Sequence, residues 1–92
     1  MKREYWLDKL YWDKNWNAWS SYECEEIYQD YKQALQEYNE TKTNLKDNEA
    51  VEFWVVDWDD EEDEMIDYKV KYHFEKKGKV WENDRKTIKR RN

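Results

Sequence analysis

An apolar side chain recurs at every second position between Ile66 and Phe74, and this alternation restricts the fold more than any other feature of the chain. The intervening positions are polar: Asp67, Lys69, Lys71 and His73. Because successive side chains of a strand point to opposite faces, the pattern predicts a strand with one buried and one solvated face. The segment from Ala50 to Trp58 is apolar on both alternating sets and predicts a second strand, either buried on both faces or buried on one and covered by aromatic rings on the other.

Two helices are predicted before these strands. Residues 4–12 carry apolar side chains around much of a helical circumference, which favours a short helix. Ser20 and Glu23 have the spacing of a capping box, in which both side chains satisfy free backbone N–H groups. The apolar residues that follow have helical spacing: Cys24, Ile27, Tyr28, Tyr31, Ala34, Leu35 and Tyr38. This tyrosine-rich stripe predicts an amphipathic helix of about 20 residues.

The remaining segments complete an α+β fold. Residues 15–19 are predicted as a connector, Gly78 as the positive-φ residue of a turn, and residues 80–88 as a third strand at the sheet edge. We expect a single domain over residues 1–92. In it, an N-terminal short helix and one long amphipathic helix pack on a three-stranded antiparallel β-meander.

Composition bears on whether and where such a chain folds. Charged residues make up 43% of the sequence, which is typical of disorder, but 17 aromatic side chains supply enough bulk for a small core. The one cysteine, Cys24, excludes an internal disulfide and favours a reducing compartment. The acidic N-terminal segment does not resemble a secretory signal, and no apolar run is long enough to cross a membrane. We therefore expect a cytoplasmic location.

The net charge of −6 conceals two opposed blocks. Residues 50–67 hold nine acids and no base, whereas residues 68–92 hold ten bases and three acids. The acids are densest between Asp57 and Glu64, where seven of eight residues are carboxylates. Repulsion among these carboxylates destabilises the compact state, and nothing within the run offsets it.

Three interpretations of the run from Asp57 to Glu64 compete. In the first, it is a solvated hairpin tip partly neutralised by nearby lysines: Lys69, Lys71, Lys76, Lys77 and Lys79. In the second, it is a calcium loop, but Glu62 and Tyr68 stand where that loop needs a glycine and a bidentate glutamate. In the third, its carboxylates take the place of nucleic-acid phosphates on a basic partner, and charge neutralisation drives binding.

The third interpretation predicts two anionic rows and two anchors. One row consists of Asp57, Asp59 and Glu61, about 6.6–6.8 Å apart along an extended strand. The other consists of Glu23, Glu26 and Asp30 on the predicted long helix, and Trp54 and Trp58 are the anchors. The full predicted partner-binding set is Asp57, Asp59, Asp60, Glu61, Glu62, Asp63, Glu64, Glu23, Glu26, Asp30, Trp54 and Trp58.

Two other binding modes remain open. The segment from Arg85 to Arg91 holds five bases in seven residues and favours direct binding to nucleic acid, with Tyr72, Phe74 and Trp81 as stacking platforms. Alternatively, the tyrosine stripe of the predicted helix joins copies of the chain into an oligomeric scaffold. Catalysis is not expected, because His73 is predicted on the polar side of a strand and Cys24 in the core. No cofactor or metal is expected.

The acidic run and the predicted acidic helix face together resemble a class of small phage-encoded inhibitors, the anti-CRISPR and anti-restriction proteins, several of which mimic DNA. The resemblance is one of character and carries no motif. It implies an inhibitor that occupies the basic nucleic-acid groove of a nuclease, CRISPR effector or polymerase. It also implies a monomer or homodimer, located in the host cytoplasm if the chain is phage-encoded.

Overall fold

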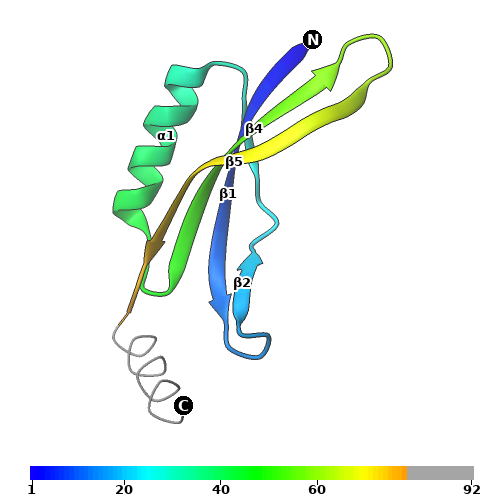
Figure 1. The fold of residues 1–92 in the computed structure, drawn as a ribbon. Coiled ribbons are helices and arrows are strands. Elements are labelled where there is room, and N and C mark those ends of the chain that lie inside the picture. The colour runs from blue at the N-terminus through cyan, green and yellow to red at the C-terminus, as the bar shows by residue number, and fades with distance from the viewer. Residues whose placement is uncertain (79–92) are drawn as a thin grey trace.

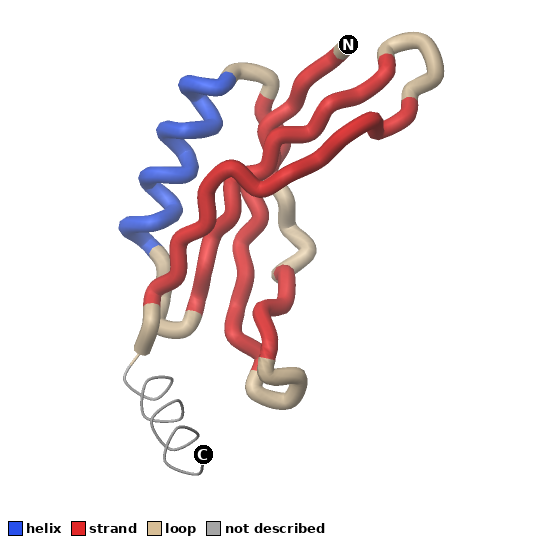
Figure 2. Tube along the Cα trace, in the orientation of Figure 1, coloured by secondary structure: helices blue, strands red, loops and turns tan. Residues whose placement is uncertain are grey.

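A computed structural model of the protein describes residues 1–78, and in these residues five strands form one antiparallel sheet with a helix on one face (Figure 1). The strand order is β2-β1-β4-β5, and β3 pairs with β1. The elements are β1 Lys2–Asp13, β2 Ala18–Ser21, β3 Glu26–Tyr28, α1 Tyr31–Asn44, β4 Glu49–Asp59 and β5 Glu64–Lys76. In Figure 2, more of the chain is drawn as strand than as helix. The predicted architecture of two helices on a three-stranded meander is therefore wrong.

The predicted N-terminal helix is instead the long strand β1. Its residues pair with β4 throughout, for example Leu7 with Phe53 and Trp6 with Trp54. Apolar residues that would surround the whole circumference of a helix lie on both faces of the sheet when the same residues form a strand. Both faces of β1 are used, since Leu7 lies in the core under the helix and Leu10 is buried on the other side of the sheet.

The predicted long helix is interrupted at its start. Ser20 belongs to β2, and Cys24 is exposed in the connection that follows, so the capping box and the core cysteine are both wrong. The helix α1 begins only at Tyr31, where the Asp30 side chain accepts a hydrogen bond of 3.0 Å from the backbone N–H of Gln33. Before that point, Tyr28 pairs with Tyr5 in the sheet.

The two strands predicted from alternation are confirmed as β4 and β5, which pair with each other. The turn predicted at Gly78 is wrong, because β5 continues to Lys76 and Gly78 does not have a positive φ. Gly78 is required there by space, since a Cβ atom would lie 2.8 Å from the Cβ of Asp47. The predicted strand over residues 80–88 lies outside the described residues.

The core lies between α1 and the sheet and is built from rings around Phe53. Phe53 is fully buried, and its ring centroid lies 5.6–5.9 Å from those of four tyrosines: Tyr5, Tyr31, Tyr38 and Tyr72. The tyrosine stripe of the helix is thereby used inside the protein. Tyr38 is buried and Tyr31 packs on Phe53, so these two rings of the stripe belong to the core, and joining of copies through the stripe stays a prediction.

A bulge in β5 changes which face its apolar residues occupy. Phe53 pairs with Tyr72, but the next residue, Trp54, pairs with Val70, so Lys71 is an extra residue. Since an unpaired residue shifts the alternation by one, Tyr72 and Phe74 face the helix while Tyr68 and Val70 face the other side. The prediction of one buried face is therefore wrong, and all four side chains are 37–62% exposed.

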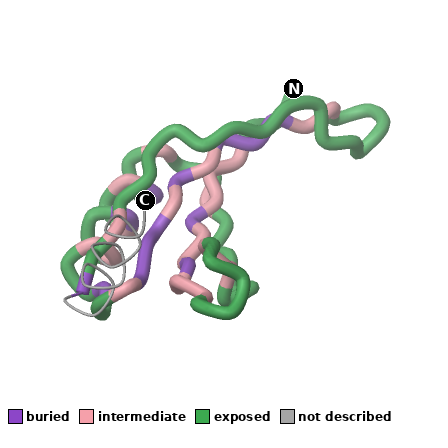
Figure 3. The backbone as a smooth tube through the Cα atoms, turned by 60° about the horizontal axis from the view of Figure 1, so that its bottom comes forward, coloured by how far each residue is buried: buried purple, intermediate pink, exposed green. Residues whose placement is uncertain are grey.

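The protein is elongated, with principal extents of 53 × 25 × 18 Å. The hairpin of β4 and β5 reaches past the helix and ends in the turn of residues 60–63, beside the N-terminus (Figures 1 and 2). Burial is concentrated along β1, β4 and the helix, whereas the far end of the hairpin is exposed (Figure 3). We call residues 57–70 of this hairpin the arm.

Candidate interaction surface

The acidic run forms the end of the arm. Asp59 organises the turn, because its Oδ1 accepts a hydrogen bond of 2.9 Å from the backbone N–H of Glu61 and its carbonyl accepts one of 3.0 Å from that of Asp63. Asp63 adopts the left-handed conformation with φ of 54°, which aspartate tolerates better than most residues. The resulting turn exposes five consecutive carboxylates, at residues 60–64.

Within residues 1–78, two cationic groups form ion pairs with this acidic run. The Nε and Nη2 atoms of Arg3 donate hydrogen bonds of 2.7 and 3.1 Å to the two carboxylate oxygens of Asp57. These hydrogen bonds hold the pKa of Asp57 below its usual value. The amino group of Met1 lies 2.8 Å from Asp60, and its pKa is raised by that contact. Within residues 1–78, the carboxylates at positions 61–64 form no ion pair.

Two of the lysines expected to neutralise the run, Lys71 and Lys76, form their contacts elsewhere, and Lys79 lies outside the described residues. The Nζ atom of Lys71 lies over the ring of Tyr31 at 4.8 Å, and that of Lys76 donates to the carbonyl of Leu45 at 3.2 Å. The positive charge of Lys69 helps to lower the pKa of Asp57, which lies in β4 before the turn. The exposed end of the arm therefore keeps most of its negative charge in the described part of the chain.

Neither predicted anionic row exists in the predicted form. Asp57 is 9% exposed and paired with Arg3, and the strand ends at Asp59, so Glu61 belongs to the turn and not to an extended row. The second row is not on a helix. Glu23 lies in a connection with φ of 60°, Glu26 belongs to β3 and Asp30 caps α1. Glu26 also accepts a hydrogen bond from the hydroxyl of Tyr28.

The predicted anchors Trp54 and Trp58 lie on the face of the sheet away from the helix. Their register places them with Trp6 and with the directly opposed pair Trp12 and Trp19. All five indoles are half-buried. The indole N–H groups of Trp58 and Trp6 both donate to Oε1 of Glu4, at 2.7 and 3.3 Å, and these hydrogen bonds fix the orientation of the two rings. We call this side of the sheet the tryptophan face.

A hollow of about 260 Å³ on the tryptophan face was not predicted from the sequence. Its lining residues are Trp6, Asp8, Glu25, Trp54, Val56, Met65 and Tyr68. The residues come from β1, β4, β5 and the connection before β3. Tyr68 belongs to the alternating pattern of residues 66–74. Because that pattern does not reveal the bulge at Lys71, it predicts the ring of Tyr68 on the same face as Phe74.

His73 forms a small polar cluster on β5. Its two ring nitrogens lie 2.8 Å from Glu52 and 2.9 Å from Glu75. Burial alone lowers the pKa of His73, but the hydrogen bonds to Glu75 and Glu52 outweigh it and the pKa is raised. Trp19 donates to the same oxygen of Glu75 at 3.0 Å.

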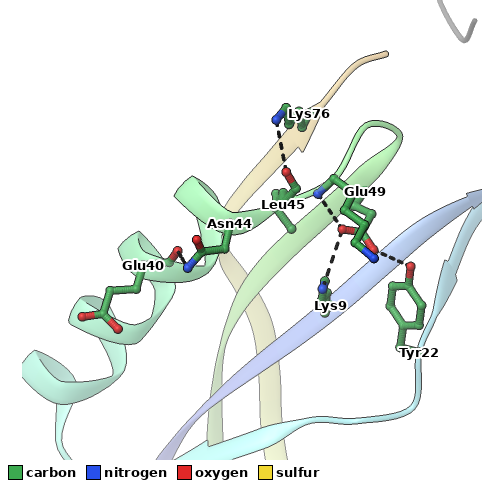
Figure 4. Close-up of polar contacts among 8 residues, drawn as sticks. Lys9, Tyr22, Glu40, Asn44, Leu45, Glu49 and Lys76 are labelled. Carbon is green, nitrogen blue, oxygen red and sulfur yellow. Dashed lines mark hydrogen bonds and ion pairs between the residues drawn. The ribbon is translucent and has the colours of Figure 1, made fainter.

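A second polar cluster joins the end of the helix to the sheet (Figure 4). Glu49, which is 5% exposed, accepts hydrogen bonds from the backbone N–H of Lys46 at 2.7 Å and from the hydroxyl of Tyr22, and lies 3.6 Å from Lys9. Burial raises the pKa of Glu49, but these partners together bring it below its usual value. The hydrogen bond to Glu49 raises the pKa of Tyr22 to about 12.

Other classes of site were also considered. In residues 1–78, no group of three or more His, Cys, Asp or Glu side chains is arranged to hold a metal ion. None of the helices described there is long and apolar enough to cross a membrane. The basic segment from Arg85 to Arg91, and Trp81 with it, lies outside the described residues.

Comparison with protein-family models, with curated proteins and with solved structures gave no match to the chain.

Proposed function

We propose that the protein is a binding inhibitor that places its acidic arm in the basic nucleic-acid groove of a nuclease, CRISPR effector or polymerase. The observation that carries this proposal is the projecting end of the arm at residues 60–64, whose carboxylates are exposed and, within residues 1–78, mostly without an ion pair. A partner whose groove is built for phosphates supplies the missing cations, and release of bound counterions favours the complex.

The flank of the arm supports the same role. Met65, Ile66, Tyr68 and Val70 are 40–62% exposed beside the acidic turn. Charge gives fast association and orientation, whereas buried aromatic and apolar anchors supply most of the affinity of a protein interface. The arm combines both kinds of group on one projecting element.

Neutralising the turn tests the proposal. The triple variant Glu61→Gln, Glu62→Gln, Asp63→Asn removes three charges, and asparagine tolerates the positive φ of position 63. Each exposed charge pair contributes roughly 0.2–1 kcal/mol, so we expect binding to weaken by about tenfold. The measurement is capture of nucleic-acid-handling proteins from a bacterial lysate on the immobilised chain, followed by release with short duplex DNA.

The matched control removes three exposed or half-exposed acids away from the arm and outside the predicted partner-binding set, by Glu37→Gln, Glu40→Gln and Asp47→Asn. This control should capture the same DNA-releasable proteins as the wild type. Equal capture by the triple variant of the turn, or captured proteins that duplex DNA does not release, would contradict the proposal.

A further inference from the structure

The hollow on the tryptophan face combines aromatic walls with carboxylates. Trp54 and Tyr68 form one wall, with ring centroids 6.0 Å apart and planes inclined by 34°. Trp6 lies directly across from Trp54 in the pairing of β1 with β4, so the two indoles are adjacent on one face. Asp8 and Glu25 complete the lining on the side of β1.

The carboxylates of the hollow have no cationic partner in residues 1–78. Asp8 is half-buried and accepts a hydrogen bond of 2.7 Å from the hydroxyl of Ser21, and no ion pair is formed by Asp8 or by Glu25. Burial raises the pKa of Asp8, and the nearby charges of Glu25 and Glu52 raise it further. An incoming cation relieves this repulsion.

The chemistry of the hollow selects one kind of occupant. An apolar side chain would cover the rings but leave the carboxylate of Asp8 desolvated with only the hydroxyl of Ser21 and no cation beside it, which is costly. A guanidinium group is planar and weakly hydrated, stacks on aromatic faces and donates to carboxylates, whereas an ammonium group is more strongly hydrated. Aromatic rings beside unpaired carboxylates therefore favour arginine.

We propose that this hollow, lined by Trp6, Trp54 and Tyr68 with Asp8 and Glu25, binds an arginine side chain of a basic partner protein. The inference rests on the proposed function and deepens it, since arginine-rich surfaces line grooves that bind phosphates. Met65, two residues after the acidic turn, lines the hollow, so an arginine bound there lies next to that turn.

Titration of the ¹⁵N-labelled protein with a short blocked peptide containing one arginine tests the site directly. We expect saturable shifts of the indole N–H signals of Trp6 and Trp54, weaker shifts with the lysine peptide, and none with the norleucine peptide. Equal shifts with the norleucine peptide, or shifts confined to the amides of residues 60–64, would overturn the proposal.

Substitutions at exposed lining residues keep the fold intact. Tyr68→Ser and Glu25→Gln should each raise the dissociation constant of the arginine peptide by about three- to fivefold, while Tyr68→Phe retains the affinity. Trp16→Ser and Glu40→Gln, at exposed sites outside the hollow, are the matched controls and should change nothing. Unchanged affinity in both lining variants would contradict the assignment.

The triple variant of the turn separates this inference from the proposed function. In that variant the arginine peptide should still shift Trp6 and Trp54, even though capture of the partner is weakened. Loss of those indole shifts in the triple variant would assign peptide binding to the charge of the turn and overturn the hollow as the site. Persistent indole shifts together with unimpaired partner capture would contradict the proposed function alone.

Discussion

Replacing Phe53 with alanine is expected to lower the free energy of unfolding by about 3–5 kcal/mol, as measured by urea denaturation. Phe53 is fully buried and touches rings from β1, the helix and β5, so its loss opens a cavity where three elements meet. Small domains have only about 5–15 kcal/mol to lose. If the wild type lies at the lower end of that range, a loss of about 5 kcal/mol leaves much of the variant unfolded at room temperature.

Two further substitutions test whether this ring holds the core. Phe53→Leu keeps most of the buried volume and should cost less than Phe53→Ala. Trp16→Ala removes a ring that is 79% exposed and should change stability by no more than about 0.5 kcal/mol. A loss below about 1 kcal/mol for Phe53→Ala would show that the ring cluster is not the centre of the core.

The second large effect is expected at Glu49. Glu49→Ala removes two part-buried hydrogen bonds to a carboxylate, from the hydroxyl of Tyr22 and from the backbone N–H of Lys46, and a hydrogen bond to a charged group contributes about 1.5–3 kcal/mol. We expect a total loss of about 2–3 kcal/mol at pH 7. Glu49→Gln retains an acceptor and should lose less, which distinguishes the hydrogen bonds from the charge.

The same residue predicts a pH dependence. The pKa of Glu49 is lowered in the folded protein from its ordinary value of 4.5. Its charge therefore stabilises the fold above pH 4.5, and that stabilisation is lost as the pH falls through the lowered pKa. The difference in unfolding free energy between wild type and Glu49→Gln should shrink below pH 4.5, and a difference that grows on acidification would contradict this assignment.

The strands β4 and β5 were predictable because alternation and runs of β-branched and aromatic residues are local signals. Residues 4–12 were misread, since apolar side chains on both faces of a strand resemble those around a buried helix. The start of the helix was misplaced because Ile27 and Tyr28 have helical spacing relative to Tyr31, yet Tyr28 pairs with Tyr5 in the sheet. Only the pairing of Tyr28 with Tyr5, which is distant in the sequence, distinguishes a strand from a helix at this position.

The candidate site was predictable in composition but not in geometry. Seven carboxylates at a hairpin end follow directly from the sequence. The pairing of Arg3 with Asp57 joins residues 54 positions apart and has no local signal. The extra residue Lys71 moves Tyr68 to the tryptophan face, and a single unpaired residue cannot be read from an unbroken alternation.

The central claim is that the charge of the arm binds a basic groove. The most direct test is the dissociation constant of a captured, DNA-releasable partner between about 50 and 200 mM salt. For the wild type, log Kd should rise steeply with log salt concentration, and the triple variant of the turn should have a clearly smaller slope. Equal slopes for the two proteins would contradict the claim, because the removed carboxylates would then take no part in binding.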